Sequence, residues 1–284
     1  MANLNALLGA AKKAGIGKEE EVNIKVSSDS IDISKDSTRI ELLDYIMIFL
    51  CERIDLKMSV FKGGYVLTKL IPDEARLTED IYFSVSTEGQ YKDIIPVLDE
   101  LGKIFVDKGI ITDYEIKPTI APTSSGGIKM SPVDGTSQIK IDIGWHDLSW
   151  GVQKWGCFGF DNNRFEIERM LSDKISAIYS RKRFRRTKDL YDFYILTNNF
   201  DVKMSVLRKY VDMRGTIEWD RDPFREEVLS EYAKAYGVLK VETRDGVGIT
   251  KPAFDVIIYR LRDFMNNYNN DVVWSHVERV YKQE

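Results

Sequence analysis

Two consecutive glycines between a predicted strand and a predicted helix are the feature that most constrains how this chain can fold. The strand covers 57–61, the glycines are Gly63 and Gly64, and the helix covers 65–70. Glycine allows a sharp backbone turn, and the N–H groups at the start of the helix can then approach a phosphate closely. The alternative is a strand–turn–helix corner that binds nothing. The glycine pair alone leaves both interpretations open.

Two aspartates on predicted strands are candidates for holding a divalent cation against such a phosphate. Asp80 begins the strand 80–85. Asp142 lies in the strand 138–145, where isoleucines alternate with other residues, so that one face is apolar and the opposite face carries Asp142. Carboxylate oxygens are typical Mg²⁺ ligands. Asp142 is therefore either a solvated residue on an outer face or part of a site beside Asp80.

A lysine on the apolar side of a predicted helix is the third candidate. The helix covers 165–182, and its apolar stripe is formed by Ile167, Met170, Leu171 and Ile178. Lys174 falls near the middle of this stripe, a position that lysine avoids unless its ammonium extends to solvent or meets an anion. Arg181 lies two turns later on nearly the same face, which favours an anion site.

The next predicted helix, 187–198, carries Asp189 and Asp192 three residues apart on one face. These carboxylates either pair with the basic run before them or help to organise a site. The basic run covers 181–188, and its candidate nucleic-acid-binding residues are Arg181, Lys182, Arg183, Arg185 and Arg186. Such a run either guides an RNA or is a solvated helix end, where cations also favour the helix dipole.

The order of elements predicts an α+β fold, with a mixed sheet and flanking helices followed by a helical C-terminal region. A capping box from Thr38 to Glu41 begins a helix over 38–56. Further helices are predicted at 90–108, 202–212, 222–236 and 252–268, and further strands at 110–117 and 127–131. We expect a polar lead-in over 1–37, an α/β domain over 38–160 and a helical domain over 161–284.

Composition excludes several other classes of protein. The chain has 284 residues, 43% of them hydrophobic, and a net charge of −4, so it can bury a core but carries no global field for nucleic acid. No stretch approaches the roughly 18 apolar residues of a membrane span. Cys51, Cys157, His146 and His276 lack the spacing of a disulfide framework or a zinc site. We expect a soluble cytosolic protein that does not bind membranes.

Taken together, these motifs resemble the AbiEii-type nucleotidyltransferase toxins of bacterial abortive-infection and toxin–antitoxin systems. That family has Lys-Gly-Gly, a helix, and then Arg-x-Ser/Thr-x-Asp-Ile/Leu-Asp-Phe. This chain has Lys62-Gly-Gly64, and then Arg76-Leu-Thr-Glu-Asp-Ile-Tyr-Phe83. A later family signature is similar to the segment from Glu166 to Lys174 and to Lys188-Asp-Leu-Tyr-Asp-Phe193. The resemblance covers about residues 38–200.

The resemblance implies a nucleotidyltransferase-like domain over 38–160 that binds magnesium and a nucleoside triphosphate. It implies transfer of a nucleotidyl group to a cellular target, which is tRNA in some members, and it suggests a cognate antitoxin as a partner. The residues carried over are Lys62, Gly63, Gly64, Thr78 and Asp189 for nucleotide binding, Asp80 and Asp142 for metal binding and catalysis, Lys174 for triphosphate contact and catalysis, and Asp192 for ordering the catalytic site.

The chain departs from the family pattern at one position. Tyr82 stands where the family has the second aspartate of Asp-x-Asp, and on a strand it shares a face with Asp80. A neutral phenol is a poor magnesium ligand. Three hypotheses follow: an active nucleotidyltransferase, a catalytically degenerate relative that binds nucleotide or RNA, or an α/β protein with no ligand. The last hypothesis treats Lys174, the glycine pair and Asp142 as three coincidences.

Overall fold

The chain folds into two compact units in a computed structural model. The first unit comprises the residues up to Tyr65 and Thr78–Arg164, and the second comprises Val66–Leu77 and Phe165–Glu284. The structure describes residues 25–54, 59–86, 88–117, 125–145, 150–180, 186–215, 217, 219, 222–241 and 248–284. Each unit is described by itself below.

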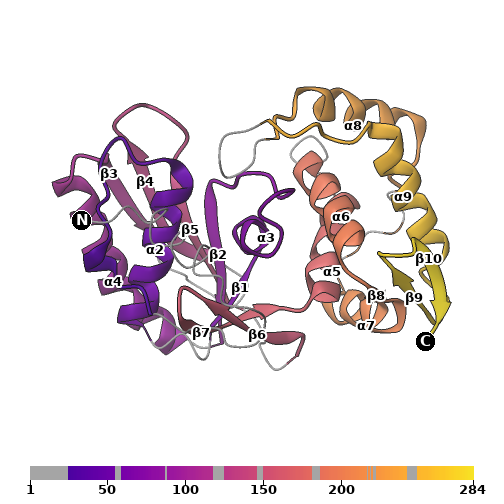
Figure 1. Cartoon of the computed structure of the whole chain (residues 1–284), viewed down its shortest axis with the longest axis horizontal. Coiled ribbons are helices and arrows are strands. Elements are labelled where there is room, and N and C mark those ends of the chain that lie inside the picture. The colour runs from indigo at the N-terminus through magenta and orange to yellow at the C-terminus, as the bar shows by residue number, and fades with distance from the viewer. Residues whose placement is uncertain are drawn as a thin grey trace, which may run out of the picture. The chain divides into compact units, whose positions relative to one another are not determined.

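A seven-stranded mixed sheet forms the centre of the first unit (Figure 1). Its strands are β1 (Ser59–Lys62), β2 (Asp80–Val85), β3 (Ile111–Lys117), β4 (Ser125–Pro132), β5 (Ile139–Trp145), β6 (Val152–Cys157) and β7 (Phe160–Phe165). Their order is β3-β4-β5-β2-β1-β7-β6. The β2–β5 and β1–β7 pairs are parallel, whereas β1–β2, β3–β4 and β4–β5 are antiparallel.

One face of this sheet is apolar and forms the core with two helices, α2 (Arg39–Arg53) and α4 (Glu88–Asp107). Ile81 and Phe83 of β2 are fully buried, and so are the three isoleucines of β5. The alternation in the sequence predicts this arrangement, because successive side chains of a strand point to opposite faces. The polar residues between the apolar ones, including Asp80 and Asp142, therefore share the other face.

Helix α2 begins where the capping box predicts. The Thr38 hydroxyl accepts a hydrogen bond from the Glu41 amide at 3.4 Å, and the Glu41 carboxylate accepts one from the Thr38 amide at 2.8 Å. The helix ends at Arg53 rather than at residue 56. The lead-in before α2 contains a short 3₁₀-helix, η1 (Ser28–Ser30), and two buried isoleucines, Ile31 and Ile33.

The second unit is mainly helical, as predicted. Helix α3 (Gly64–Leu70) leads into it from the glycine pair. The helices that follow in the described residues are α5 (Ile167–Ile178), α6 (Thr187–Asn199), α7 (Met204–Arg214), α8 (Glu226–Val238) and α9 (Phe254–Asn266). Helix α5 packs on α6 and α7, and α6 also contacts α8 and α9. The apolar stripe of α5 supplies core residues such as Leu171 and Ile175.

Five strands have no counterpart in the sequence-based prediction. Two of them, β6 and β7, are joined by Phe158 and Gly159, which both have positive φ angles (54° and 76°), as a type I′ turn requires. The other three form a small sheet in the second unit in the order β10-β9-β8, from β8 (Val202–Lys203), β9 (Val272–Ser275) and β10 (Val280–Gln283). The C-terminal region is therefore helical with a small sheet at its end.

Among the residues that the structure describes, no helix combines the length and the apolar character needed to cross a bilayer.

Candidate active site

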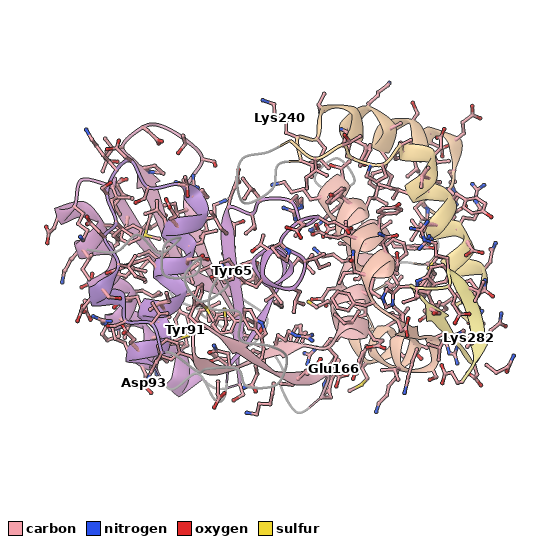
Figure 2. All side chains as sticks on the ribbon, viewed as in Figure 1. Tyr65, Tyr91, Asp93, Glu166, Lys240 and Lys282 are labelled. Atoms are coloured by element: carbon pink, nitrogen blue, oxygen red, sulfur yellow. The ribbon has the colours of Figure 1, made fainter. Side chains whose placement is uncertain are left out.

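The glycine corner connects β1 to α3, and its backbone conformation requires glycine at one position. Gly63 has φ +81°, and a Cβ built there would lie 3.6 Å from the Cβ of Tyr82, an ordinary contact. The requirement is thus conformational rather than steric. Beyond the corner, the buried Tyr65, which is labelled in Figure 2, donates a hydrogen bond to Asp44 of α2 at 2.9 Å within the first unit.

This conformation predicts the effect of a substitution on stability. Gly63→Ala should lower the free energy of unfolding by about 1–2 kcal/mol, because a residue with a Cβ is disfavoured at positive φ. Gly64→Ala is the control, since Gly64 is not among the glycines with positive φ. Urea unfolding of both variants measures the difference. An equal, small effect at the two positions would contradict a conformational requirement for glycine at Gly63.

The strand register brings two predicted site residues, Lys62 and Asp142, into one row with Tyr82 on the polar face of the sheet. Tyr82 of β2 pairs with Asp142 of the parallel strand β5 and with Lys62 of the antiparallel strand β1. The Lys62 ammonium lies 5.5 Å from the centre of the Tyr82 ring. Tyr82 therefore occupies the middle of the row, between a cation at the glycine corner and a carboxylate.

Asp80 lies two residues before Tyr82 on the same face of β2, opposite Lys140 of β5. Asp80 and Asp142 are thus diagonal neighbours on adjacent strands. A strand spacing of about 4.8 Å and a rise of about 3.3 Å per residue put their Cα atoms about 8 Å apart. The Thr78 hydroxyl contacts the backbone of Asp80 at both its N–H and its carbonyl, at 3.5 and 3.3 Å, so Thr78 helps to position Asp80.

Two carboxylates on one face fit the way in which proteins hold Mg²⁺. The ion usually keeps several waters and takes one or two carboxylates together with the phosphates of a substrate. Within the described part of the chain, no group of three or more His, Cys, Asp and Glu side chains could hold a metal. Asp80 and Asp142 could supply two of the oxygen ligands of an ion that also binds water and substrate phosphates.

The environment of Asp142 affects its proton affinity. Burial raises the pKa of the Asp142 carboxyl, and the nearby Lys140, Lys129 and Lys117 oppose this effect only in part. Two of these lysines also lie opposite carboxylates in the sheet, Lys140 opposite Asp80 and Lys129 opposite Glu115.

Lys174 in the second unit meets carboxylates rather than solvent. Its ammonium donates to Asp189 at 2.9 Å and to Asp192 at 2.7 Å, and only 11% of its side chain is exposed. Asp192 has no exposed side-chain surface and also accepts two hydrogen bonds from Arg76, both at 2.9 Å. The lysine in the apolar stripe thus belongs to a buried cluster of two cations and two carboxylates.

The charges in this cluster stabilise one another. Burial by itself would raise the pKa of Asp192, but Arg76 and Lys174 outweigh it and lower the pKa. Burial would likewise lower the pKa of Lys174, but Asp189 and Asp192 raise it. Both shifts favour the charged forms of Asp192 and Lys174. Arg76 was not among the predicted site residues, although it begins the Arg-x-Thr-x-Asp motif that ends at Asp80.

Most of the basic run lies outside the described residues: Arg181, Lys182, Arg183 and Arg185 belong to the undescribed segment 181–185. Arg186 is described, and its guanidinium lies 3.5 Å from the Asp189 carboxylate, one turn along α6. An ion pair between the basic run and α6 is thus present at this position.

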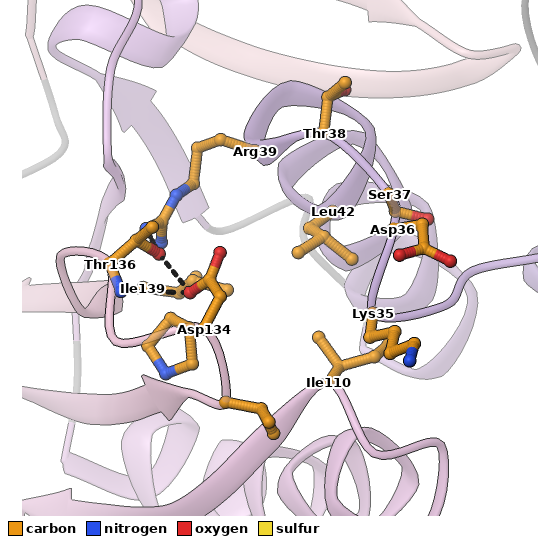
Figure 3. Close-up of a pocket in the computed structure, with 12 residues that line it drawn as sticks. Lys35, Asp36, Ser37, Thr38, Arg39, Leu42, Ile110, Asp134, Thr136 and Ile139 are labelled. Carbon is orange, nitrogen blue, oxygen red and sulfur yellow. Dashed lines mark hydrogen bonds between the residues drawn. The ribbon is translucent and has the colours of Figure 1, made fainter.

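A pocket of about 420 Å³ lies at the N-terminus of α2, and no predicted site residue lines it (Figure 3). Arg39 extends into the pocket toward Thr136 and donates a hydrogen bond to the Ser137 carbonyl. Asp134 accepts two hydrogen bonds from Thr136, at 2.9 and 2.7 Å. Leu42 and Ile139 form part of its apolar lining. Short polar turns such as 132–137 give no sequence signal for a pocket.

Comparison with solved structures defines the class of fold. A candidate nucleotidyltransferase from Helicobacter pylori matches with a TM-score of 0.51 and 18% identity, over 81% of this chain and 94% of that one. JHP933 from H. pylori gives 0.48 and 18%, over 82% and 97%. An antigenic nucleotidyltransferase-like protein from Paracoccidioides brasiliensis gives 0.36 and 17%, over 69% and 92%. The first match shows that the fold is that of a nucleotidyltransferase.

Comparison with protein families is more specific. The model of the family described as nucleotidyl transferase AbiEii toxin, type IV toxin–antitoxin system, matches residues 49–258. The chain therefore belongs to the AbiEii family, as its motifs predict. A search of curated proteins found no match.

Proposed function

We propose that this protein is an active nucleotidyltransferase toxin that transfers a nucleotidyl group from a nucleoside triphosphate to a cellular target. The observation that carries the proposal is the placement of Asp80 and Asp142 on one polar face of the sheet, next to a glycine corner with positive φ. Family membership gives the class of reaction. The first unit would be the nucleotidyltransferase domain, and the second a helical domain.

The proposed reaction is an in-line displacement at the α-phosphorus. An oxygen of the target attacks, a new P–O bond forms, and the bond to the β-phosphate oxygen breaks. Pyrophosphate leaves with the electron pair, and the attacking hydroxyl loses its proton to a base. Positioning and electrostatic stabilisation supply most of the catalysis in such transfers.

The residues of the first unit would divide these tasks among them. The N–H groups at Gly63 and Gly64 and the Lys62 ammonium would bind the triphosphate. Asp80 and Asp142 would hold Mg²⁺, which neutralises charge on the phosphates when it is bound. A carboxylate of this pair would also accept the proton of the attacking hydroxyl, and Asp142 is our candidate.

In the second unit, Lys174 is our candidate for the triphosphate-contacting lysine that the family resemblance implies. Asp189 and the buried Asp192 already orient its ammonium, so we assign them positioning roles. The basic run from Arg181 to Arg186 would guide an RNA substrate, with tRNA as one candidate target. A cognate antitoxin is the partner that the type IV family suggests.

Tyr82 favours a second candidate function, a degenerate relative that binds nucleotide without turnover. Its ring stands in the row between Lys62 and Asp142, where the family pattern has a second metal-binding aspartate. Transfer by the wild-type chain would contradict the second function. Transfer by Tyr82→Asp alone would establish it.

The thermal stabilisation of the protein is expected to require a nucleoside triphosphate together with Mg²⁺. A nucleoside triphosphate with Mg²⁺ should raise the thermal midpoint, since saturation at 100 times Kd contributes about 2.7 kcal/mol. Mg²⁺ alone should cause no shift, because two carboxylates are an incomplete site without phosphates. Asp80→Asn should reduce the shift, and Asp107→Asn, an exposed aspartate at the end of α4, should not. A thermal midpoint that does not change with any of the four triphosphates in the presence of Mg²⁺ would contradict nucleotide binding.

A further inference from the structure

Three lysines lie side by side on the polar face of the first unit's sheet, next to the Asp80–Asp142 pair. Lys140 of β5 pairs with Lys129 of β4 across the strands. Lys117 of β3 pairs with Gly127, two residues before Lys129, so Lys117 and Lys129 are diagonal neighbours. We call Lys117, Lys129 and Lys140 the lysine triad. It spans three adjacent strands, or about 10 Å.

The triad places Lys129 and Lys140 directly opposite each other on neighbouring strands, with Glu115 on the far side of Lys129 and Asp80 on the far side of Lys140. Lys117 lowers the pKa of the Lys129 ammonium, and Lys140 adds to this effect. Glu115, opposite Lys129, offsets the repulsion only in part. Like charges directly opposite each other on neighbouring strands are destabilising, and a bound anion would relieve the repulsion between Lys129 and Lys140.

Protection of a sheet edge does not explain this arrangement. Lysines are common on edge strands, where they prevent pairing with other chains. Lys117 is on the edge strand β3, but β4 and β5 are interior strands. Lys117 is exposed, and Lys129 and Lys140 are half-buried on a face where Gly127 adds no side chain between Lys117 and Asp142.

The position of the triad in the sheet indicates which anion it faces. Along the strand order, the glycine corner lies at β1, the carboxylates lie on β2 and β5, and the triad lies on β5, β4 and β3. In an in-line displacement, the attacking and leaving oxygens lie on opposite sides of the α-phosphorus. With the triphosphate at the glycine corner, the triad lies on the side from which the acceptor approaches.

We propose that the lysine triad binds backbone phosphates of an acceptor RNA and holds its reactive end at the Asp80–Asp142 pair. This inference rests on the proposed function, which supplies the donor and the direction of transfer. Lysine binds phosphates as a point charge without base specificity. The triad therefore contributes affinity and position, and sequence selection lies elsewhere.

The test compares two triple variants of the full chain with equal loss of charge. The first is Lys117→Gln, Lys129→Gln and Lys140→Gln. The control is Lys92→Gln, Lys103→Gln and Lys108→Gln, on or just after α4, the helix that covers the opposite face of the sheet. The probe is fluorescently labelled unfractionated tRNA, with its binding measured over a range of salt concentrations.

Log affinity falls with log salt concentration, and each lost phosphate contact should reduce the magnitude of this slope by about 0.7–0.9. The slope of the triad variant should therefore be less steep than that of wild type by about 2–3. The control should keep the wild-type slope. The triad variant should unfold close to the wild-type temperature, because it loses the repulsion between Lys129 and Lys140 together with their attraction to Glu115 and Asp80. Its thermal shift with Mg²⁺ and triphosphate should persist.

Three results would overturn the proposal. One is equal tRNA binding by the two triple variants. Another is loss of the triphosphate shift in the triad variant with tRNA binding retained, which would assign the lysines to the donor. The third is transfer of the label of a labelled triphosphate to a protein rather than to RNA by the wild-type chain. This result would leave nucleotidyl transfer intact while removing the RNA acceptor. Failure of the proposed function is distinct from all three, because wild type would then transfer no label to any acceptor.

Discussion

Asp142→Asn should reduce nucleotide transfer by on the order of 10²-fold or more and abolish growth inhibition on induced expression. The substitution removes one negative charge from the polar face of the sheet with almost no change in volume, so the fold should persist. An amide is a weaker ligand for a hard cation than a carboxylate and cannot serve as a base at neutral pH.

The matched control for Asp142→Asn is Glu115→Gln, which removes the same charge from the same unit at an exposed position of β3. Glu115→Gln should retain transfer and toxicity. Asp80→Asn should behave like Asp142→Asn, because both aspartates belong to the proposed metal site. Equal toxicity of wild type and Asp142→Asn would contradict the assignment.

Asp192→Ala should produce the largest loss of stability, about 3–5 kcal/mol, because it leaves two buried cations without their shared carboxylate. Arg76 and Lys174 both donate to this side chain, which has no exposed surface. Glu278→Ala is the control in the same unit, since its ion pair with Lys282 is exposed and such pairs contribute only about 0.2–1 kcal/mol. Guanidinium unfolding monitored by circular dichroism gives both values. A loss below about 1 kcal/mol at Asp192 would show that the cluster is not held by this carboxylate.

The same residue predicts a pH dependence of stability. Arg76 and Lys174 outweigh the effect of burial and lower the pKa of Asp192 below its ordinary value of 3.8. Its contribution to stability is therefore complete above that value and is lost as the pH falls through the lower pKa of the folded state. Wild type should lose stability in this acid range, and Asp192→Asn should lack that part of the loss. Identical acid profiles would contradict the prediction.

Local sequence patterns predicted the elements on which the candidate site depends. The alternation in 80–85 and 139–145 identified both strands and the face of each aspartate, since this information lies in neighbouring residues. The capping box located the start of α2. The hairpin of β6 and β7 was missed because its turn uses Phe158 at positive φ, where the usual signal is asparagine or aspartate before glycine.

Contacts between distant segments could not be predicted from local patterns. The helical wheel left two explanations for Lys174, and the carboxylates that pair with it lie on a different helix. Arg76 lies 116 residues before its partner Asp192. The lysine triad depends on strand order and register, because β5 pairs with β2 on one side and with β4 on the other. Periodicity identifies the polar side of each strand but not its neighbours.

Incubation of the wild-type chain with each triphosphate labelled at its α-phosphorus, Mg²⁺ and total cellular RNA and protein tests the central claim most directly. The account predicts label in a macromolecule from at least one triphosphate. It also predicts none after chelation of the metal, and none with Asp80→Asn or Asp142→Asn. Absence of label with all four triphosphates, or equal labelling by wild type and both variants, would contradict it.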